Sequence, residues 1–176
     1  MRIISGLYKS KVINAPASLP VRPTTDFAKT GLFNILANQF DFEDVSVLDL
    51  FAGTGNITYE FLSRGAKHVC SVDIHEECYK FIFKTVNDLH FDNTQIVRKD
   101  VFKFLDACTG KFDIIFADPP YTLENKSEIV SLVFSNQLLT TDGKLILEHS
   151  EKESMLHLPH YESTRKYGHV AFSFFS

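Results

Sequence analysis

The sequence predicts one α/β domain of three layers, in which helices cover both faces of a mostly parallel seven-stranded sheet. From residue 45 onward, short β-rich runs alternate regularly with helical stretches, and such alternation builds right-handed βαβ units. The run 45–51 is apolar apart from one acid, as in a parallel strand that is covered on both sides. The last two expected strands, 162–167 and 169–175, are joined through Gly168 and should therefore pair antiparallel.

At the N-terminus, residues 2–12 are expected to form a short β-hairpin that precedes a helix. Thr24, Thr25 and Asp26 supply the cap and first-turn chemistry of that helix. Its broad apolar face is expected to comprise Phe27, Leu32, Phe33, Ile35 and Leu36. The single domain, 1–176, thus consists of an N-terminal hairpin and helix extension, 1–40, and a core, 41–176.

In the core, each expected strand leads through a turn into a helix. The strand 45–51 is followed by a turn with two glycines and by a helix over 57–64, which Gly65 ends as a C′ glycine does. Further strands are expected over His68–Asp73, Thr94–Arg98, Phe112–Ala117 and, after an Asp142-Gly143 turn, 144–148. The intervening helices are expected over 75–89, 101–108 and 128–139.

The composition argues against several classes of protein. No apolar run approaches the roughly 20 residues that span a bilayer, and the N-terminus lacks the features of a signal peptide. The three cysteines, Cys70, Cys78 and Cys108, are odd in number and show no metal-type spacing, so we expect buried reduced thiols. A cytoplasmic protein that uses neither membrane nor metal is therefore expected.

The formal net charge of −4 is unevenly distributed. Residues 1–31 carry five basic residues against one acid, whereas the rest of the chain carries 13 basic and 21 acidic residues. A basic arm on an acidic body is suited to contact nucleic-acid phosphates. An ordinary solvated strand pair is the alternative interpretation.

The segment Asp49-Leu-Phe-Ala-Gly-Thr-Gly55 stands at the carboxyl end of a strand, where open α/β sheets bind ligands. Its glycines allow a sharp turn, and the next helix offers unpaired N–H groups. A phosphate-binding loop would need Gly-x-x-x-x-Gly-Lys, and no such Lys is present. A dinucleotide fingerprint would need a third glycine, where Thr58 stands. S-Adenosylmethionine (SAM) remains, because the methyltransferase form of this loop begins with an acid.

Acids at three consecutive strand ends are the principal expected cofactor contacts. Asp49 is assigned to the amino group of SAM, directly or through water, and Asp73 to the ribose hydroxyls. Asp100, with Val101, is placed to hold the adenine edge. For any one of these acids, a helix cap or a loop carboxylate is the alternative. The expected cofactor-binding residues are Asp49, Phe51, Ala52, Gly53, Thr54, Gly55, Asp73, Ile74, Asp100, Val101 and Asp118.

The tetrad Asp118-Pro-Pro-Tyr121 follows the expected strand Phe112–Ala117 and is the candidate catalytic motif. Pro119 and Pro120 fix the backbone and remove two N–H donors. An exocyclic amine on a base is a poor nucleophile, because its lone pair is delocalised into the ring. If the Asp118 carboxylate and the Pro119 carbonyl accept hydrogen bonds from the two N–H groups of the amine, the lone pair becomes localised on the nitrogen and is directed at the methyl group. Tyr121 supplies a ring on which an extruded base can stack.

These motifs resemble the class I methyltransferases, and more narrowly the RsmD-type family of small-subunit (16S) ribosomal RNA guanine-N2 methyltransferases. The resemblance covers nearly the whole chain. Besides the two motifs, it rests on Arg2-Ile-Ile-Ser-Gly6 with Lys9 and Lys11, Arg22-Pro-Thr-Thr-Asp26, Leu32-Phe-Asn-Ile-Leu36, Leu62-Ser-Arg-Gly-Ala66 and the strand-ending Glu148. Two features depart from the family pattern: Asn56-Ile57-Thr58 replaces smaller apolar residues, and the overall charge is acidic.

The resemblance implies a Rossmann-like fold in which residues 41–176 form a SAM-binding catalytic core. It implies methylation of the N2 amino group of a guanine in small-subunit ribosomal RNA, on an assembled or assembling subunit, by a monomer. The implied substrate or RNA contacts are Arg2, Lys9, Lys11, Arg22, Thr24 and Tyr121.

Two other functions remain open from the residues alone. A DNA or RNA methyltransferase acting on adenine N6 or cytosine N4 would use the same tetrad, although reading base edges in DNA usually needs a separate region, for which the gaps between strands are too short. A non-catalytic SAM- or RNA-binding module is the other alternative, and it would be expected to show damage in one of the two motifs.

Overall fold

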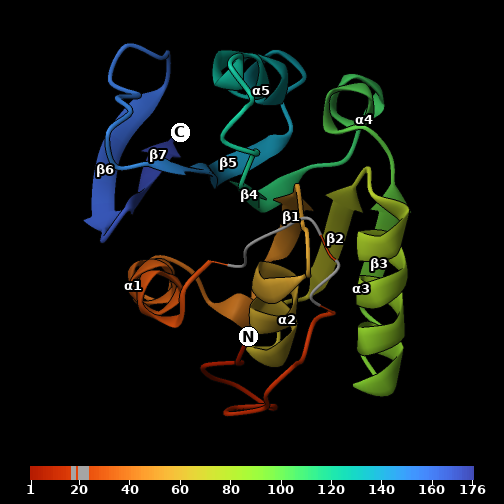
Figure 1. Ribbon diagram of the computed structural model, residues 1–176. Helices are drawn as coiled ribbons and strands as arrows, with labels where there is room; N and C mark the ends of the chain where they lie inside the picture. Colours follow the sequence, from red (N-terminus) through yellow and green to blue (C-terminus); the bar gives the residue numbers. More distant parts are fainter. Residues whose placement is uncertain (17–18, 20–23) are drawn as a thin grey trace.

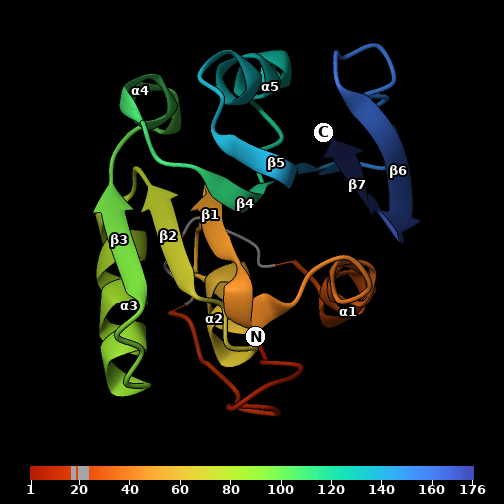
Figure 2. The same cartoon turned by 180° about the vertical axis from the view of Figure 1, so that it is seen from behind.

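The computed structural model describes residues 1–16, 19 and 24–176. Seven strands form one sheet in the order β3-β2-β1-β4-β5-β7-β6, shown from two sides in Figures 1 and 2. The strands are β1 (Ser46–Leu50), β2 (His68–Asp73), β3 (Thr94–Arg98), β4 (Phe112–Ala117), β5 (Leu139–Ser150), β6 (Tyr161–Tyr167) and β7 (Val170–Phe175). Strands β1 to β5 are parallel, and β7 pairs antiparallel with both β5 and β6. The expected fold class is confirmed.

Helices cover both faces of this sheet. One apolar cluster joins the sheet to α1 (Asp26–Leu36), α2 (Asn56–Ser63) and α3 (Glu76–Asp88). A second cluster joins the opposite face to α4 (Val101–Ala107) and α5 (Lys126–Ser135). A short 3-10 helix, η1 (Phe42–Asp44), precedes β1. In the described part of the chain, no helix is long and apolar enough to cross a membrane.

The strand order places a topological switch point between β1 and β4. From β1 the chain proceeds outward on one side through β2 and β3, and then returns to β4 on the other side. The loops after β1 and β4 therefore diverge in opposite directions, and in open α/β sheets ligands bind in the crevice that forms at such a point, outside the carboxyl ends of the strands. The fold thus places the segments after Leu50 and Ala117 next to each other, and Asp118 N–H donates a hydrogen bond of 3.3 Å to the Leu50 carbonyl.

The N-terminal segment forms less β-structure than expected. The two arms of the expected hairpin over 2–12 do pair, through the antiparallel bridge between Arg2 and Val12 and the hydrogen bond from the Ile3 N–H to the Lys11 carbonyl at 3.0 Å, but they form no longer strands. The tip of this hairpin also contacts α2, since the Leu7 N–H donates to the carbonyl of Ser63 at 2.7 Å. Gly6 permits this approach with φ +81, because a Cβ there would lie 1.8 Å from the same carbonyl oxygen.

A fully buried ion pair fixes this segment to α2. The Lys29 ammonium lies 3.1 Å from a Glu60 carboxylate oxygen, and both side chains are inaccessible to solvent. Glu60 also accepts hydrogen bonds from the backbone N–H groups of Ile4 and Ser5 at 2.8 and 3.1 Å. The segment is therefore held by its own backbone N–H groups, which donate to a buried carboxylate. The pattern of apolar residues in the sequence does not predict this arrangement.

Three expected details of the secondary structure are wrong. The Asp142-Gly143 pair is not a turn but lies inside β5, because an irregularity in the β4–β5 register absorbs the extra residues. The helix α5 starts at Lys126 and ends at Ser135, and the left-handed φ of +52 at Gln137 redirects the chain into β5. Phe27 is 67% exposed rather than packed with the apolar face of α1. The Thr25 hydroxyl caps α1 as expected, accepting from the Ala28 N–H.

Candidate active site

Four carboxylates gather at the carboxyl ends of adjacent strands. Asp49 belongs to β1, Asp73 ends β2, Asp118 follows β4 and Glu148 lies near the end of β5. Asp49, Asp73 and Glu148 are buried, and Asp118 is partly exposed. None of the four forms an ion pair with a Lys, Arg or His of the described residues. This edge of the sheet is therefore acidic and lacks a neutralising cation among the residues that the structure describes.

The loop Phe51–Gly55 crosses this edge in an unusual backbone conformation. Phe51, Gly53 and Gly55 all have positive φ, at 59°, 55° and 78°. The Ala52 N–H donates to the Val72 carbonyl at 3.1 Å, which ties the loop to the next strand. Gly55 then serves as the N-cap of α2 without a side-chain cap, so the first N–H groups of the helix face the crevice.

Asp73 holds the loop with both of its carboxylate oxygens. Oδ2 accepts from the Gly53 N–H and Oδ1 accepts from the His75 N–H, each at 2.8 Å. Each oxygen has a further lone pair that could accept a ribose hydroxyl. Ile74, the next residue, is 53% exposed beside the loop. Asp73 therefore has a structural function in addition to the cofactor contact expected of it.

Asp100 caps α4, accepting a 3.0 Å hydrogen bond from the Lys103 N–H. The structure thus realises the alternative interpretation of this acid, and a contact with adenine remains a prediction. Val101 is buried at the start of the same helix.

Asp49 is buried against α2. Its Oδ2 accepts a 2.5 Å hydrogen bond from the hydroxyl of Thr58, which in turn lies 2.7 Å from the Ser71 hydroxyl. Burial raises the pKa of Asp49 to about 7, although the hydrogen bonds from Thr58 oppose this shift. Thr58 occupies the position of the third glycine in a dinucleotide fingerprint. In this protein its hydroxyl orients Asp49, the acid at the start of the cofactor loop.

Asp118 occupies a similar environment on the other side of the switch point. Burial, together with the charges of Glu148 and Asp49, raises its pKa well above the ordinary value. Pro119 is buried and Pro120 is exposed, so the chain turns outward directly after the acid. Tyr121, three residues after the acid, is 67% exposed.

Glu148 is the site residue that was missing from the expected contacts. It is buried, and its Oε2 accepts a 2.8 Å hydrogen bond from the hydroxyl of Thr24. Burial raises the pKa of Glu148 to about 7, and the hydroxyl of Thr24 opposes this shift. An acid at the end of an otherwise apolar strand, next to the strand that carries the tetrad, was the available sequence signal.

The expected RNA contacts are not brought together by the fold. Lys9 and Lys11 are exposed on the N-terminal segment beside the C-terminal end of α2. That helix has eight residues, so this end lies about 12 Å from the cofactor loop. Arg2 pairs with Asp26 at 3.2 Å, and Thr24 points inward to Glu148. Arg22 lies outside the described residues.

The sequence does not indicate whether His149, Arg165 or Tyr167, all near the C-terminus, contacts the substrate. His149 is the most buried of the three. Its Nε2 lies 2.7 Å from the Ser173 hydroxyl, so the ring packs among the terminal strands. Arg165 is exposed, and Tyr167 packs edge-on against Phe27 with ring centroids 5.7 Å apart.

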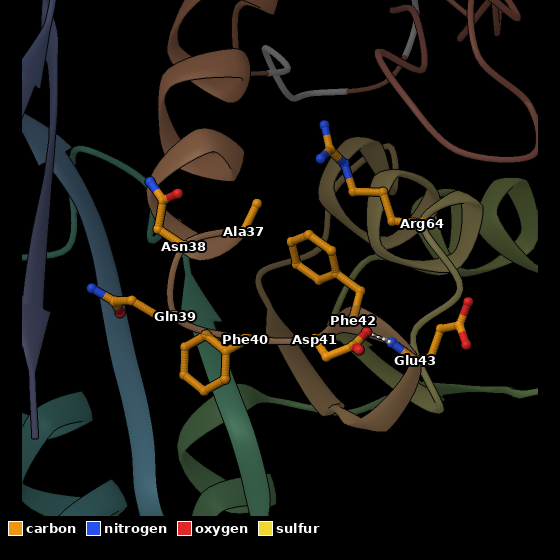
Figure 3. A pocket seen from close by; sticks show the side chains of 8 residues that line it. All are labelled: Ala37, Asn38, Gln39, Phe40, Asp41, Phe42, Glu43 and Arg64. Atoms are coloured by element: carbon orange, nitrogen blue, oxygen red, sulfur yellow. Dashed lines mark hydrogen bonds between the residues drawn. The ribbon is translucent and has the colours of Figure 1, made fainter.

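A surface hollow of about 510 Å³ lies at the other end of the sheet, and Figure 3 shows the side chains that line it. It is bordered by residues 37–43 and by Arg64, which follows α2. The guanidinium of Arg64 lies 4.6 Å from the Phe33 ring centroid and 5.5 Å from that of Phe42. Because residues 37–43 precede β1, the hollow is remote from the carboxyl ends of the strands. It is not the crevice described above.

The raised carboxyl pKa values predict how stability depends on pH. A carboxyl with a raised pKa binds its proton more tightly in the folded protein than in the unfolded chain. Its contribution to stability is therefore lost as the pH rises through the folded pKa. For Asp49 and Glu148 that pKa is about 7. We expect the Tm of the ligand-free protein to fall between about pH 5 and about pH 8, and Asp49→Asn to reduce the fall. Circular dichroism melts test this, and a Tm that rises throughout would contradict it.

Gly55 is expected to be essential for the cofactor loop. A Cβ at this position would lie 2.6 Å from Cζ and 2.7 Å from the hydroxyl of Tyr59. Gly55→Ala should therefore displace the loop and lower the affinity for SAM by at least about tenfold, the equivalent of about 1.4 kcal/mol. The matched control is Gly168→Ala, since Gly168 also has positive φ but has open space around it. Calorimetric titration with SAM measures both variants, and equal affinities would show that the contact with Tyr59 is unimportant.

Comparison with known proteins identifies relatives over the whole chain. The family model described as conserved hypothetical protein 95 matches residues 1–176. Ribosomal RNA small subunit methyltransferase D of Escherichia coli K12 is 32% identical over 156 residues, covering 89% of this chain and 77% of that protein.

Solved structures share the fold. A hypothetical protein from Thermus thermophilus has a TM-score of 0.86 at 25% identity, covering 100% of this chain and 99% of its own. A methyltransferase in complex with SAH has a TM-score of 0.67 at 18% identity, covering 83% of this chain and 48% of its own, and it supports the fold alone.

Proposed function

The chain belongs to the family described as conserved hypothetical protein 95, and from this membership we propose its function. It is a SAM-dependent methyltransferase that methylates the exocyclic N2 amino group of a guanine in small-subunit ribosomal RNA. The E. coli relative named ribosomal RNA small subunit methyltransferase D supports the reaction and the RNA. The resemblance inferred from the motifs is thereby confirmed at the level of the family.

The observation that carries this proposal is the position of the two motifs. The loop that begins at Asp49 and the tetrad that begins at Asp118 flank the switch point of the sheet, joined by the hydrogen bond from Asp118 N–H to the Leu50 carbonyl. A cofactor held by the first motif therefore lies beside an amine held by the second. Effective alignment of two reactants is itself a large part of catalysis.

The charge of the site fits SAM, which carries an ammonium and a sulfonium group. Buried carboxylates without a neighbouring cation raise one another's pKa values, and a bound cation would relieve that cost. Asp49 would hold the ammonium group, Asp73 the ribose hydroxyls and the segment from Asp100 the adenine edge. When bound, SAM supplies an activated methyl group on its sulfonium. The solved structure in complex with SAH shows that this fold accommodates the demethylated cofactor.

The remaining chemistry belongs to the chain. The Asp118 carboxylate and the Pro119 carbonyl accept hydrogen bonds from the two N–H groups of the exocyclic amine, which localises the nitrogen lone pair and directs it to where the methyl group would lie. Tyr121, which is exposed, stacks on the extruded base. As the nitrogen gains the methyl group it loses one proton, which the Asp118 carboxylate accepts.

The proposal extends to the setting of the reaction. Residues 41–176 act as the catalytic core of one domain, and residues 1–40 are its N-terminal extension. The protein acts as a cytoplasmic monomer, without a metal, on RNA within the small subunit. Its acidic body, with 21 acids against 13 basic residues after residue 31, is better suited to a structured ribonucleoprotein than to naked RNA. Arg2, Lys9, Lys11 and Arg22 are the proposed phosphate contacts.

One experiment tests both the base and the substrate. Undermethylated small subunits and, separately, naked ribosomal RNA are incubated with SAM that carries a tritiated methyl group, and the labelled nucleoside is then identified. We expect N2-methylguanosine, formed more rapidly on subunits. Label in N6-methyladenosine, or label on duplex DNA, would support an amino-methyltransferase of another specificity. Cofactor binding without transfer to any nucleic acid would support the non-catalytic module.

A further inference from the structure

The tetrad selects an amino group but does not by itself select guanine, because adenine and cytosine also carry exocyclic amines. We propose that Glu148 is the residue that recognises guanine, by accepting the N1–H of the base while Asp118 accepts from the N2 amino group. Thr24 positions Glu148 for this contact. The inference rests on the proposed function and adds its specificity-determining residue.

The register of the sheet places the two acids side by side. Strands β4 and β5 are parallel, with Ala117 opposite Leu147, so Asp118 and Glu148 are the next residues in register and lie on the same face. Neighbouring strands are separated by about 4.8 Å. Two carboxylates at this spacing can reach two adjacent donors on one edge of a base.

The chemistry of that edge distinguishes guanine from the other amino bases. Guanine carries two adjacent kinds of donor, the ring N1–H and the N2 amino group. Beside the amino group, adenine and cytosine instead carry a ring nitrogen with a lone pair, which is an acceptor. An ionised carboxylate can only accept hydrogen bonds. Glu148 would therefore pair with guanine N1–H and repel the ring nitrogen of adenine or cytosine.

Glu148 is held in place by a short chain of hydrogen bonds that ends at the buried ion pair. The Thr24 hydroxyl donates to Oε2 at 2.8 Å, which leaves Oε1 to accept from the base. Asn56, the first residue of α2, donates through Nδ2 to the Thr24 carbonyl at 2.8 Å. The Lys29 ammonium donates to Oδ1 of Asn56, also at 2.8 Å. Thr24 is thereby fixed between the cofactor helix and β5.

The hydroxyl of Thr24 also favours the ionised form of Glu148, the form that recognises guanine. Burial raises the pKa of Glu148, and the donated hydrogen bond from Thr24 opposes this shift. Asp118 at the end of β4 and Asp49 on β1 are the acids that face it, and burial, together with the charge of Glu148, raises the pKa of each. The N1–H of guanine, as a second donor, would stabilise the carboxylate further.

The test compares two bases at the target position of an otherwise identical RNA. One RNA carries guanine, and the other carries 2-aminopurine, which keeps the 2-amino group but has an unprotonated N1. For the wild-type protein, kcat/KM should favour guanine by about 100-fold or more, as expected when a site built for a donor receives a base without one. In Glu148→Gln the preference should fall at least about tenfold, because the amide can donate to the unprotonated N1. Glu162→Gln, at an exposed acid paired with Lys144, is the matched control and should keep the wild-type preference.

A second variant tests the positioning by Thr24. Thr24→Val removes the hydroxyl at nearly constant shape, so the acid limb of the kcat/KM profile for guanine RNA should move to higher pH while the affinity for SAM stays the same. An unchanged base preference in Glu148→Gln, or equal use of both bases by the wild-type protein, would overturn the proposal. Failure of the wild-type protein to methylate guanine RNA at all would overturn the proposed function as well, so the two failures are distinguishable.

Discussion

Replacing Asp118 with alanine is expected to lower kcat for methyl transfer by about 10²- to 10⁴-fold, the range associated with a positioned group that accepts a proton. The affinity for SAM should change little, because all the expected cofactor contacts except Asp118 itself come from β1 and the loop after it and from the ends of β2 and β3. The folded protein should not lose stability at neutral pH. Burial and two neighbouring acids disfavour the Asp118 carboxylate in the native state, so its removal relieves a cost.

Single-turnover transfer to undermethylated small subunits measures the rate in this experiment, and calorimetry measures the affinity for SAM. Asp142→Ala, at an exposed acid in β5, is the matched control and should retain wild-type values for both. Parallel losses of rate and cofactor affinity in Asp118→Ala would show that Asp118 binds SAM rather than the base.

Replacing Lys29 with methionine is expected to destabilise the protein by about 3–5 kcal/mol, because three oxygens around the buried ammonium, on Glu60, Asn56 and Arg2, lose their donor at about 1–3 kcal/mol each. Glu60 would keep its hydrogen bonds from Ile4 and Ser5 and its 2.8 Å ion pair with Arg64, but would lose the ammonium 3.1 Å away. The carbonyl of Arg2, which accepts from Lys29 at 2.7 Å, would lose its donor as well. The N-terminal segment should consequently become more accessible to proteases.

The matched control for this variant is Lys84→Met, which removes the lysine of the exposed Lys84–Asp88 pair in α3. Exposed pairs of this kind contribute about 0.3–0.5 kcal/mol, so the control should remain close to the wild-type stability. Urea denaturation with a single reporter of helix content compares the two. A similar small loss in both variants would mean that the buried pair contributes no more than a surface pair.

The two expected results address different parts of the same hydrogen-bonded assembly. Lys29 anchors Asn56, Asn56 holds the Thr24 carbonyl, and the Thr24 hydroxyl meets Glu148 beside Asp118. A departure from the family pattern, the polar Asn56 directly after the cofactor loop, thus has a structural reason. Its amide connects the N-terminal extension with the catalytic strands.

The sequence was sufficient to predict the elements whose signals are local. The bounds of β2, β3 and β4 were predicted to the residue, because each contains β-branched or other apolar residues and ends at or just before a polar residue. The Thr25 cap of α1 was likewise predicted from adjacent residues. The two motifs indicated the cofactor and the reacting amine, since a glycine turn and an Asp-Pro-Pro-Tyr loop constrain the backbone through their own residues.

Only the tertiary structure decided which distant residues meet. Glu148 enters the site because of the β4–β5 register, and Thr24 reaches it across 124 positions of sequence. Lys9 and Lys11 lie at the far end of α2 because the N-terminal segment hydrogen-bonds to Ser63 through the N–H groups of Leu7 and Tyr8. Lys29 and Glu60 would be expected at the surface from the sequence alone, because lysine and glutamate are rarely buried unless they are paired. Both are fully buried here because they form an ion pair with each other. Such outcomes depend on contacts between segments remote in sequence, whereas the motifs depend on neighbours along the chain.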